Sequence, residues 1–362
     1  MWGENRLTRM LGIRYPVIQA GMAGGAAMPE LVAAVSEAGG LGTLGAGYLS
    51  PEEIREAIRG IRSRTDRPFA VNLLVTQEPS PSAEELQRGK ELLTPILRET
   101  GLKPREPARY APSFEAQMEV LVEEKIPAFS FTFAIPERKW LNRLKDNGTI
   151  LIGTATTVRE GELLEAAGVD LVTAQGAEAG GHRGTFAGAY DQGMVGTMAL
   201  VPQLADGIGL PVIAAGGIMD GRGLAAALAL GAEGVQMGTA FLTCTESGAH
   251  EVHQAQILEG TEENTVVTRA FSGKPARGIR NRFIDQLAGR EEEIPPYPVQ
   301  NALTKEIRQA AARRKDPEQM SLWAGQGLRL SRRQGAGELV HRVVAEAKTI
   351  WGRFAGLRGS PE

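Results

Sequence analysis

Short apolar runs alternate with segments of helical period along most of this chain. The apolar runs are continuous, which is typical of strands that are buried on both faces of a parallel sheet. The segments between them repeat apolar residues every three or four positions, as one face of an α-helix does. The pattern predicts eight strands, at residues 16–22, 41–46, 69–75, 128–133, 149–154, 169–174, 211–217 and 234–241.

Capping residues mark the ends of several predicted helices. Pro29 opens a helix that ends before Gly39, and Ser50 is an N-cap before Pro51. Between the third and fourth strands lies a longer connection, from Thr76 to about Pro112, which contains one helix. The helices after the first are predicted at residues 51–63, 83–100, 113–125, 137–147, 157–167, 197–207 and 223–230.

Eight strands that alternate with helices over about 240 residues predict a (β/α)8 barrel. A doubly wound open sheet is the alternative. It fits less well, because glycine or polar residues recur at the ends of most strands, as if all of them faced one common mouth. Residues 1–247 are therefore predicted to form the barrel.

The alternation stops after about Ser247. Helices are expected at 249–258, 302–314 and from Gly337 to about Phe354, with strand or loop at 265–268 and 269–283. Three glutamates at 291–293 precede two prolines and predict a solvated boundary. We interpret residues 248–362 as a C-terminal, mainly helical extension that packs on the barrel and contributes to the mouth, not as an independent domain.

Composition argues against several classes of partner and indicates the cellular compartment. The net charge is -3 without a basic stripe, which argues against nucleic acid. No apolar run reaches the roughly 18–20 residues that span a bilayer, and the N-terminus lacks a signal-peptide apolar core. The single cysteine, Cys244, excludes an intramolecular disulfide and is expected to be a buried, inert thiol. A cytoplasmic protein is predicted.

The most distinctive loop follows the sixth predicted strand. Residues 175–184 read QGAEAGGHRG, so His182 lies among glycines at the carboxyl end of a strand. In parallel α/β proteins ligands bind at that end. A histidine there can exchange protons near neutral pH. The alternative is a surface turn whose histidine has no functional role.

Three other strand ends point to a planar cofactor that carries a phosphate. Glycine-rich turns follow the seventh and eighth strands, where barrels commonly hold a phosphate through backbone amides. Small residues after the first strand would let a flat ring lie against the backbone. Asn72 and Gln175 could bond the edge of a ring or cap a loop turn. The candidate contacts are Ala20, Gly21, Met22, Asn72, Gln175, Gly216, Gly217, Gln236, Met237, Gly238 and Thr239.

Other chemistries lack their motifs. No G-x-G-x-x-G fingerprint opens a first βαβ unit, and neither a Walker loop nor a G-x-S-x-G elbow is present. His250 and His253 are three residues apart on a predicted helix but have no convincing set of carboxylate partners. We therefore interpret them as a solvated face and predict no metal site.

These motifs together resemble the FMN-dependent class I nitronate monooxygenases, once called 2-nitropropane dioxygenases. The resemblance covers nearly the whole chain, with two small departures: Ala20 stands where proline is common, and Ala134 where glycine is common. It is carried by residues 18–25 (IQAGMAGG), 29–31, 39–42, 71–73, 130–133, 175–184, 214–218, 236–239, 271–277 (FSGKPAR) and 323–327 (WAGQG).

The resemblance implies a barrel with tightly bound, non-covalent FMN and His182 as the active-site histidine. It adds Gly180, Gly181 and Gln326 to the expected cofactor contacts. The implied reaction oxidises alkyl nitronates with O2, as co-substrate, to a carbonyl compound and nitrite, without NAD(P)H. Propionate 3-nitronate, a toxic metabolite, is the substrate suggested for the class. A nitronate is already a carbanion equivalent, so it can give one electron to the flavin.

Two alternatives stay open at this point. An FMN-dependent enoyl-(acyl-carrier-protein) reductase has a similar Gly-Gly-His loop and would use NAD(P)H. A catalytically inactive flavin-binding protein is the more distant alternative. The expected partner is a small molecule, with neither nucleic acid nor membrane, and the sequence leaves monomer and dimer equally open.

Overall fold

The predicted barrel is confirmed by a computed structural model, which describes residues 3–76, 78–103, 107 and 109–356. Its eight parallel strands are neighbours in the order β1-β9-β8-β6-β5-β4-β3-β2. A parallel bridge between Ile18 and Leu41 brings β1 beside β2, the two ends of this order, and nearly closes the sheet. The strands are β1 (Val17–Gln19), β2 (Gly42–Gly45), β3 (Phe69–Leu74), β4 (Ala128–Thr132), β5 (Ile150–Ala155), β6 (Leu171–Gln175), β8 (Val212–Ala215) and β9 (Gly234–Met237).

Helices cover the outside of this barrel. Side chains on the outward faces of the strands pack against the helices in one large cluster that includes Leu31, Ile58, Val71 and Phe129. Ser50 and Ser82 begin α3 and α4 with capping boxes, which satisfy amides that a helix start leaves unpaired. The barrel helices are α2 (Pro29–Glu37), α3 (Pro51–Arg62), α4 (Ala83–Thr100), α5 (Phe114–Glu123), α6 (Arg138–Asp146), α7 (Val158–Ala167), α8 (Thr197–Gly207), α9 (Gly221–Ala229) and α10 (Thr239–Leu242).

The eighth predicted strand is wrong at its carboxyl end. The strand stops at Met237, and the residues from Thr239 to Leu242 form helix α10. Apolar content alone cannot separate a buried strand from a buried helical turn, so the run at 234–241 read as one element. The correction matters because it places the Gly238 turn at the mouth of the barrel.

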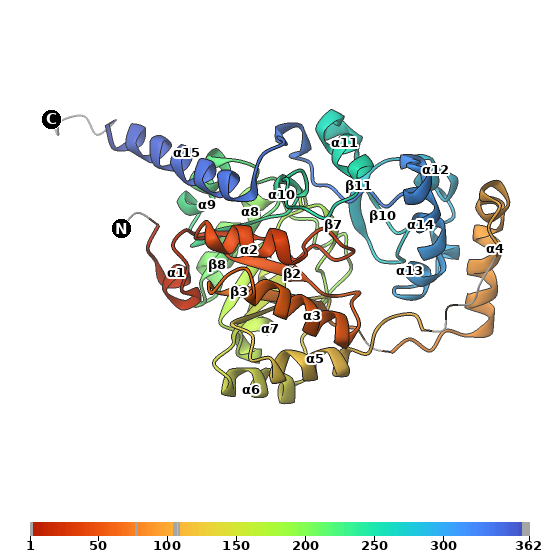
Figure 1. Ribbon diagram of the computed structural model, residues 1–362, viewed down its shortest axis with the longest axis horizontal. Coiled ribbons are helices and arrows are strands. Elements are labelled where there is room, and N and C mark those ends of the chain that lie inside the picture. The colour runs from red at the N-terminus through yellow and green to blue at the C-terminus, as the bar shows by residue number, and fades with distance from the viewer. Residues whose placement is uncertain (1–2, 77, 104–106, 108, 357–362) are drawn as a thin grey trace.

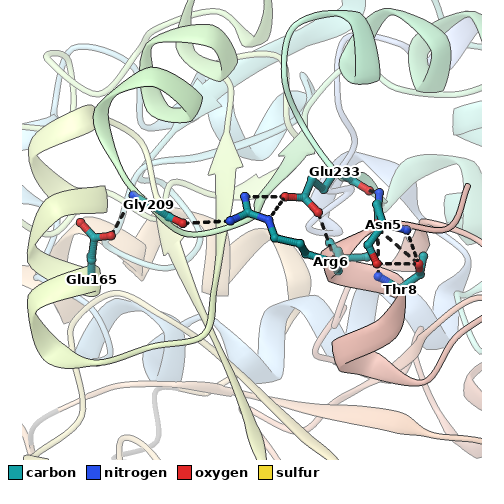
Figure 2. Close-up of polar contacts among 7 residues, drawn as sticks. Asn5, Arg6, Thr8, Glu165, Gly209 and Glu233 are labelled. Atoms are coloured by element: carbon teal, nitrogen blue, oxygen red, sulfur yellow. Dashed lines mark hydrogen bonds and ion pairs between the residues drawn. The ribbon is translucent and has the colours of Figure 1, made fainter.

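An N-terminal helix, α1 (Arg6–Leu11), was not predicted because it precedes the alternating pattern. Its Leu7 and Leu11 belong to the apolar cluster that contains Ile18 and Ile213 from the strands. Figure 2 shows how the helix is held: Arg6 Nε donates to Glu233 Oε1 at 2.7 Å, and an Arg6 amino group donates to the Gly209 carbonyl. These contacts lie at the end of the barrel opposite the mouth.

The residues after 247 pack on the barrel and on α4. In Figure 1 helix α4 lies beside α12, α13 and α14, away from the other barrel helices. Leu93 and Ile96 of α4 share an apolar cluster with Phe271, Phe283 and Ile307. The elements here are α11 (Glu251–Glu259), β10 (Thr265–Thr268), β11 (Ala276–Ile279), α12 (Arg282–Gln286), α13 (Val299–Leu303), α14 (Lys305–Arg314), α15 (Ala336–Gly356) and the short 3-10 helices Glu262–Asn264, Glu291–Glu293, Pro317–Gln319 and Leu328–Leu330.

The extension also joins the barrel through a second, small sheet. Strand β11 pairs with β10 and with β7 (Gly181–His182), the short strand within the histidine loop. The long helix α15 packs on α9 and α2. The domain boundary at 247 stays a prediction. Within the part of the chain that the structure describes, no helix has the length and apolar character to cross a membrane.

Candidate active site

One large cavity of about 1460 Å³ opens at the carboxyl ends of the barrel strands. The C-terminal extension supplies its opposite wall, with residues of α13, α14 and the segment around Trp323. Most of the predicted site residues line it: Ala20, Gly21, Met22, Asn72, Gln175, Gly180, Gly181, His182, Gly216, Gly217, Gln236, Gly238 and Thr239. The structure therefore brings together strand ends that are far apart in sequence.

Met237 and Gln326 are two predicted contacts that the structure does not bring to this cavity. Side chains alternate along a strand, so Gln236 faces the cavity while Met237, 1% exposed, packs in the cluster between strands and helices. The side chain of Gln326 is exposed, and its backbone N–H donates to the Glu178 carbonyl at 3.0 Å. Gly325 lies on the wall in its place.

The loop that carries His182 contains a short strand, whereas the sequence predicted an irregular loop throughout. Gly181 and His182 form β7, in which His182 stands opposite Ala276 of β11. The Gln175 side chain closes the loop: its Nε2 donates to the His182 carbonyl at 3.0 Å, and its Oε1 accepts from the Gly184 amide at 2.8 Å. Of the two interpretations of Gln175, the structure supports the loop cap, although the residue also lines the cavity.

Arg183 is a support of this loop that sequence reasoning missed. Its side chain is 1% exposed and donates to the carbonyls of Gly176, Gln175 and Gly193 at 2.6–2.9 Å. Burial, followed by the charge of Arg277, lowers the pKa of Arg183 to about 10. A buried arginine carries no sequence signal, since arginine is usually exposed.

The imidazole of His182 sits in an aromatic cage that the sequence did not predict. Its ring centroid lies 5.5 Å from Phe133, 5.9 Å from Tyr297 and 5.4 Å from Trp323. Phe133 has a φ of 85°, an unusual value for a bulky residue, which is held here by packing at the end of β4. The cage combines residues from the barrel with two from the extension.

The environment of His182 keeps the ring uncharged. Burial, helped by the positive charges of Lys274 and Arg308, lowers the pKa of His182 to about 3. Its Nε2 lies 2.9 Å from Ser272 Oγ, and Ser272 donates its own proton to the Lys274 carbonyl at 3.0 Å. A hydroxyl has one proton, so this pattern places the imidazole proton on Nε2 and leaves a lone pair on Nδ1.

Asn72 lies inside β3 and does not cap a loop turn. Its Nδ2 donates to Ser130 Oγ at 3.0 Å across to β4, and the side chain is almost fully buried. A Cβ on Gly21 would lie 2.3 Å from Asn72 Cβ, so only glycine fits at that position. The backbone after β1 can therefore approach this side of the cavity closely.

The turns after β8 and β9 form a cradle of glycines at the mouth. Gly216 and Gly217 have φ values of 123° and 70°, which disfavour any side chain. The amides of Gly217, Gly238 and Thr239 have no acceptor in the described residues, and Thr239 Oγ1 accepts from the Gly325 amide at 2.9 Å. Free amides beside glycines fit a phosphate, so this side of the cavity is suited to a cofactor that carries one.

The predicted solvated face at His250 and His253 is wrong. Both side chains are half-buried and line the cavity, because α11 turns toward the mouth. His250 Nδ1 accepts from the Val252 amide at 3.3 Å, and His253 Nε2 contacts the Trp323 carbonyl at 3.0 Å. Among the described residues, no group of three or more histidine, cysteine or acidic side chains is placed to hold a metal ion.

A pH effect on stability follows from His253. Burial lowers the pKa of His253 to about 4, against an ordinary value of 6.5. Between these values the unfolded histidine takes up a proton that the folded one does not, so stability falls as the pH falls from 6.5 toward 4. His253→Gln keeps a donor for the Trp323 carbonyl and should lose less stability than wild type between pH 7 and pH 5. Urea titrations at both pH values measure this, and equal losses would contradict it.

Comparison with known proteins places the chain in a family. A family model described as Nitronate monooxygenase matches residues 4–346. A "Probable nitronate monooxygenase" of Staphylococcus saprophyticus is 47% identical over 355 residues, 97% of this chain and 99% of the relative. The chain belongs to the nitronate monooxygenase family, whose members are flavin-dependent oxidoreductases.

Two solved structures share both fold and sequence with the chain. Nitroalkane oxidase from Streptomyces ansochromogenes has a TM-score of 0.88 and 39% identity, over 96% of this chain and 99% of its own. FabK from Thermotoga maritima has a TM-score of 0.76 and 35% identity, over 98% of this chain and 99% of its own. The TM-score and the sequence identity are both higher for the nitroalkane oxidase.

Proposed function

We propose that this enzyme uses FMN to oxidise alkyl nitronates, propionate 3-nitronate among them, with O2 to a carbonyl compound and nitrite. The observation that carries the proposal is an uncharged His182 in an aromatic cage, beside a cradle of glycine amides, in a member of the nitronate monooxygenase family. Such a reaction in the cytoplasm would remove a toxic metabolite.

The two sides of the cavity suit the two ends of the cofactor. Gly217, Gly238 and Thr239 would hold the phosphate, and Asn72 and Gly180 would meet the ring system. A Cβ on Gly180 would lie 2.5 Å from the backbone of Ala324, so the histidine loop packs directly on the extension at this point. When bound, FMN would accept electrons from the substrate and pass them to O2.

The residues around the cavity favour an anion that needs no deprotonation. Nδ1 of His182 could take the α-proton of a neutral nitroalkane, but burial and the charges of Lys274 and Arg308 oppose that protonation. A nitronate has already lost the proton, and the same two cations attract it. Nitronates should therefore be better substrates than the parent nitroalkanes.

Anaerobic mixing separates this proposal from the reductase alternative. The purified flavoprotein is mixed without O2 with ethyl nitronate or with NADPH, and the visible flavin absorbance is followed. Loss of colour with the nitronate and not with NADPH is the expected result. Loss of colour with NADPH alone would support an enoyl reductase, and no change with either would support an inactive flavin-binding protein.

A further inference from the structure

Arg308 is a cation at the cavity wall that the proposed reaction does not yet use. It lies on α14, is half-buried and lines the cavity, and burial lowers its pKa. Its Nη2 donates to the Asn301 carbonyl at 2.7 Å and to Asn301 Oδ1 at 2.9 Å, while its Nε donates to Thr304 Oγ1 at 3.2 Å. The guanidinium is therefore fixed in position.

The charge of Arg308 has no counter-ion in the described part of the chain. It donates hydrogen bonds to a carbonyl, an amide oxygen and a hydroxyl, and no carboxylate among the described residues forms an ion pair with it. Glu178, an acid on the cavity wall, is bound instead to the Thr197 amide and hydroxyl. A half-buried guanidinium without an anion is less favourable than a paired one, and such a group is expected where a ligand supplies the anion.

The position of Arg308 separates it from the phosphate cradle. The cradle follows β8 and β9, whereas the neighbours of Arg308 are Tyr48, which follows β2, and Tyr297, which packs on Phe133 and His182. Because the Ile18–Leu41 bridge closes the barrel between β1 and β2, the strand opposite β9 is β4, and Phe133 directly follows β4. Arg308 thus faces the substrate side, from the extension.

The unused donors in this corner match a carboxylate. With Nη2 and Nε engaged, Nη1 of Arg308 is left, and the Nδ2 amide of Asn301 has no partner among the described residues. Two nitrogen donors held together by a hydrogen bond suit the two oxygens of one carboxylate. Lys274 contributes less, since its Nζ lies over the Phe133 ring and does not line the cavity.

We infer that Arg308, together with Asn301, binds a carboxylate at the end of the substrate opposite the nitronate group. Arg308 is then a specificity-determining residue, and the enzyme selects short nitronates that carry a second, carboxylate anion over plain alkyl nitronates. This inference rests on the proposed nitronate oxidation and adds to it the residue that reads the far end of the substrate.

A substrate pair tests the inference. Initial rates give kcat/KM for propionate 3-nitronate and for propyl 1-nitronate, in which a methyl group replaces the carboxylate. Arg308→Met should lower the value for the carboxylated substrate by about 10- to 100-fold, the effect of losing a hydrogen bond to a charged group, and change the other by less than about threefold. Arg308→Lys, which keeps the charge but loses the planar fork, should fall between.

Arg313→Met is the matched control, because Arg313 is an exposed arginine of the same helix that lies outside the cavity. It should leave both values unchanged. Equal losses for both substrates in Arg308→Met, or no loss for either, would overturn the inference. Should Arg308→Met not fold, Arg308→Lys and Asn301→Ala carry the same comparison. A wild-type enzyme that turns over neither substrate would instead refute the proposed function.

Discussion

His182→Asn should lower kcat/KM for nitroethane by about 10²–10⁴-fold and that for ethyl nitronate by less than about tenfold. The nitroalkane must lose its α-proton, and Nδ1 of His182 is the base that the Ser272 contact leaves unprotonated. The nitronate has no proton to lose, so the imidazole lone pair is not required. Asparagine preserves a polar side chain of similar reach within the cage of Phe133, Tyr297 and Trp323.

Oxygen uptake with each substrate, at equal flavin content of wild type and variant, measures this split. Equal losses with both substrates would show that His182 holds the nitro group in either form and does not act as a base. A variant that loses flavin would be compared per mole of bound cofactor, so that cofactor loss is not mistaken for a catalytic effect.

Gly217→Asp should yield a folded but colourless protein that retains less than about a tenth of its flavin, through like-charge repulsion of the phosphate. A Cβ at position 217 would meet only the Glu178 side chain, at the ordinary contact distance of 3.4 Å. The protein itself therefore has room for a side chain, and the new carboxylate would project among the free amides. Flavin released by heat and measured by absorbance gives the stoichiometry.

Gly148→Asp is the matched control for that variant. Gly148 has a φ of 79°, similar to the 70° of Gly217, has nothing within 4 Å of a built Cβ and lies outside the cavity. It imposes a comparable backbone strain without reaching the cradle, and should remain yellow. Stoichiometric flavin in Gly217→Asp would contradict the placement of the phosphate.

The barrel and one side of its site could be predicted because their signals are local. A buried parallel strand is a continuous apolar run, and the turn after it carries glycine, so Gly216, Gly217 and Gly238 could be located from the sequence. The loop of His182 was found in the same way. The side chain of Met237 packs away from the cavity, because a run of candidate residues does not show which of their side chains face it.

The other wall could not be predicted, because it depends on contacts between distant segments. Ser272 bonds a histidine 90 positions earlier, and Tyr297 joins the cage from the segment before α13. Arg183 was missed for a different reason: its three acceptors are backbone carbonyls, which no residue type reveals. Only the fold of the extension over the mouth brings these groups together.

Steady-state oxygen uptake with simultaneous nitrite release shows whether the enzyme oxidises nitronates. Propionate 3-nitronate and ethyl nitronate are supplied in air-saturated buffer without NAD(P)H. Both should be oxidised, with nitrite formed as O2 is consumed, and the carboxylated substrate should be preferred. An enzyme with its full complement of flavin that consumes no O2 with any nitronate, and whose flavin is reduced by NADPH, would contradict the proposed function.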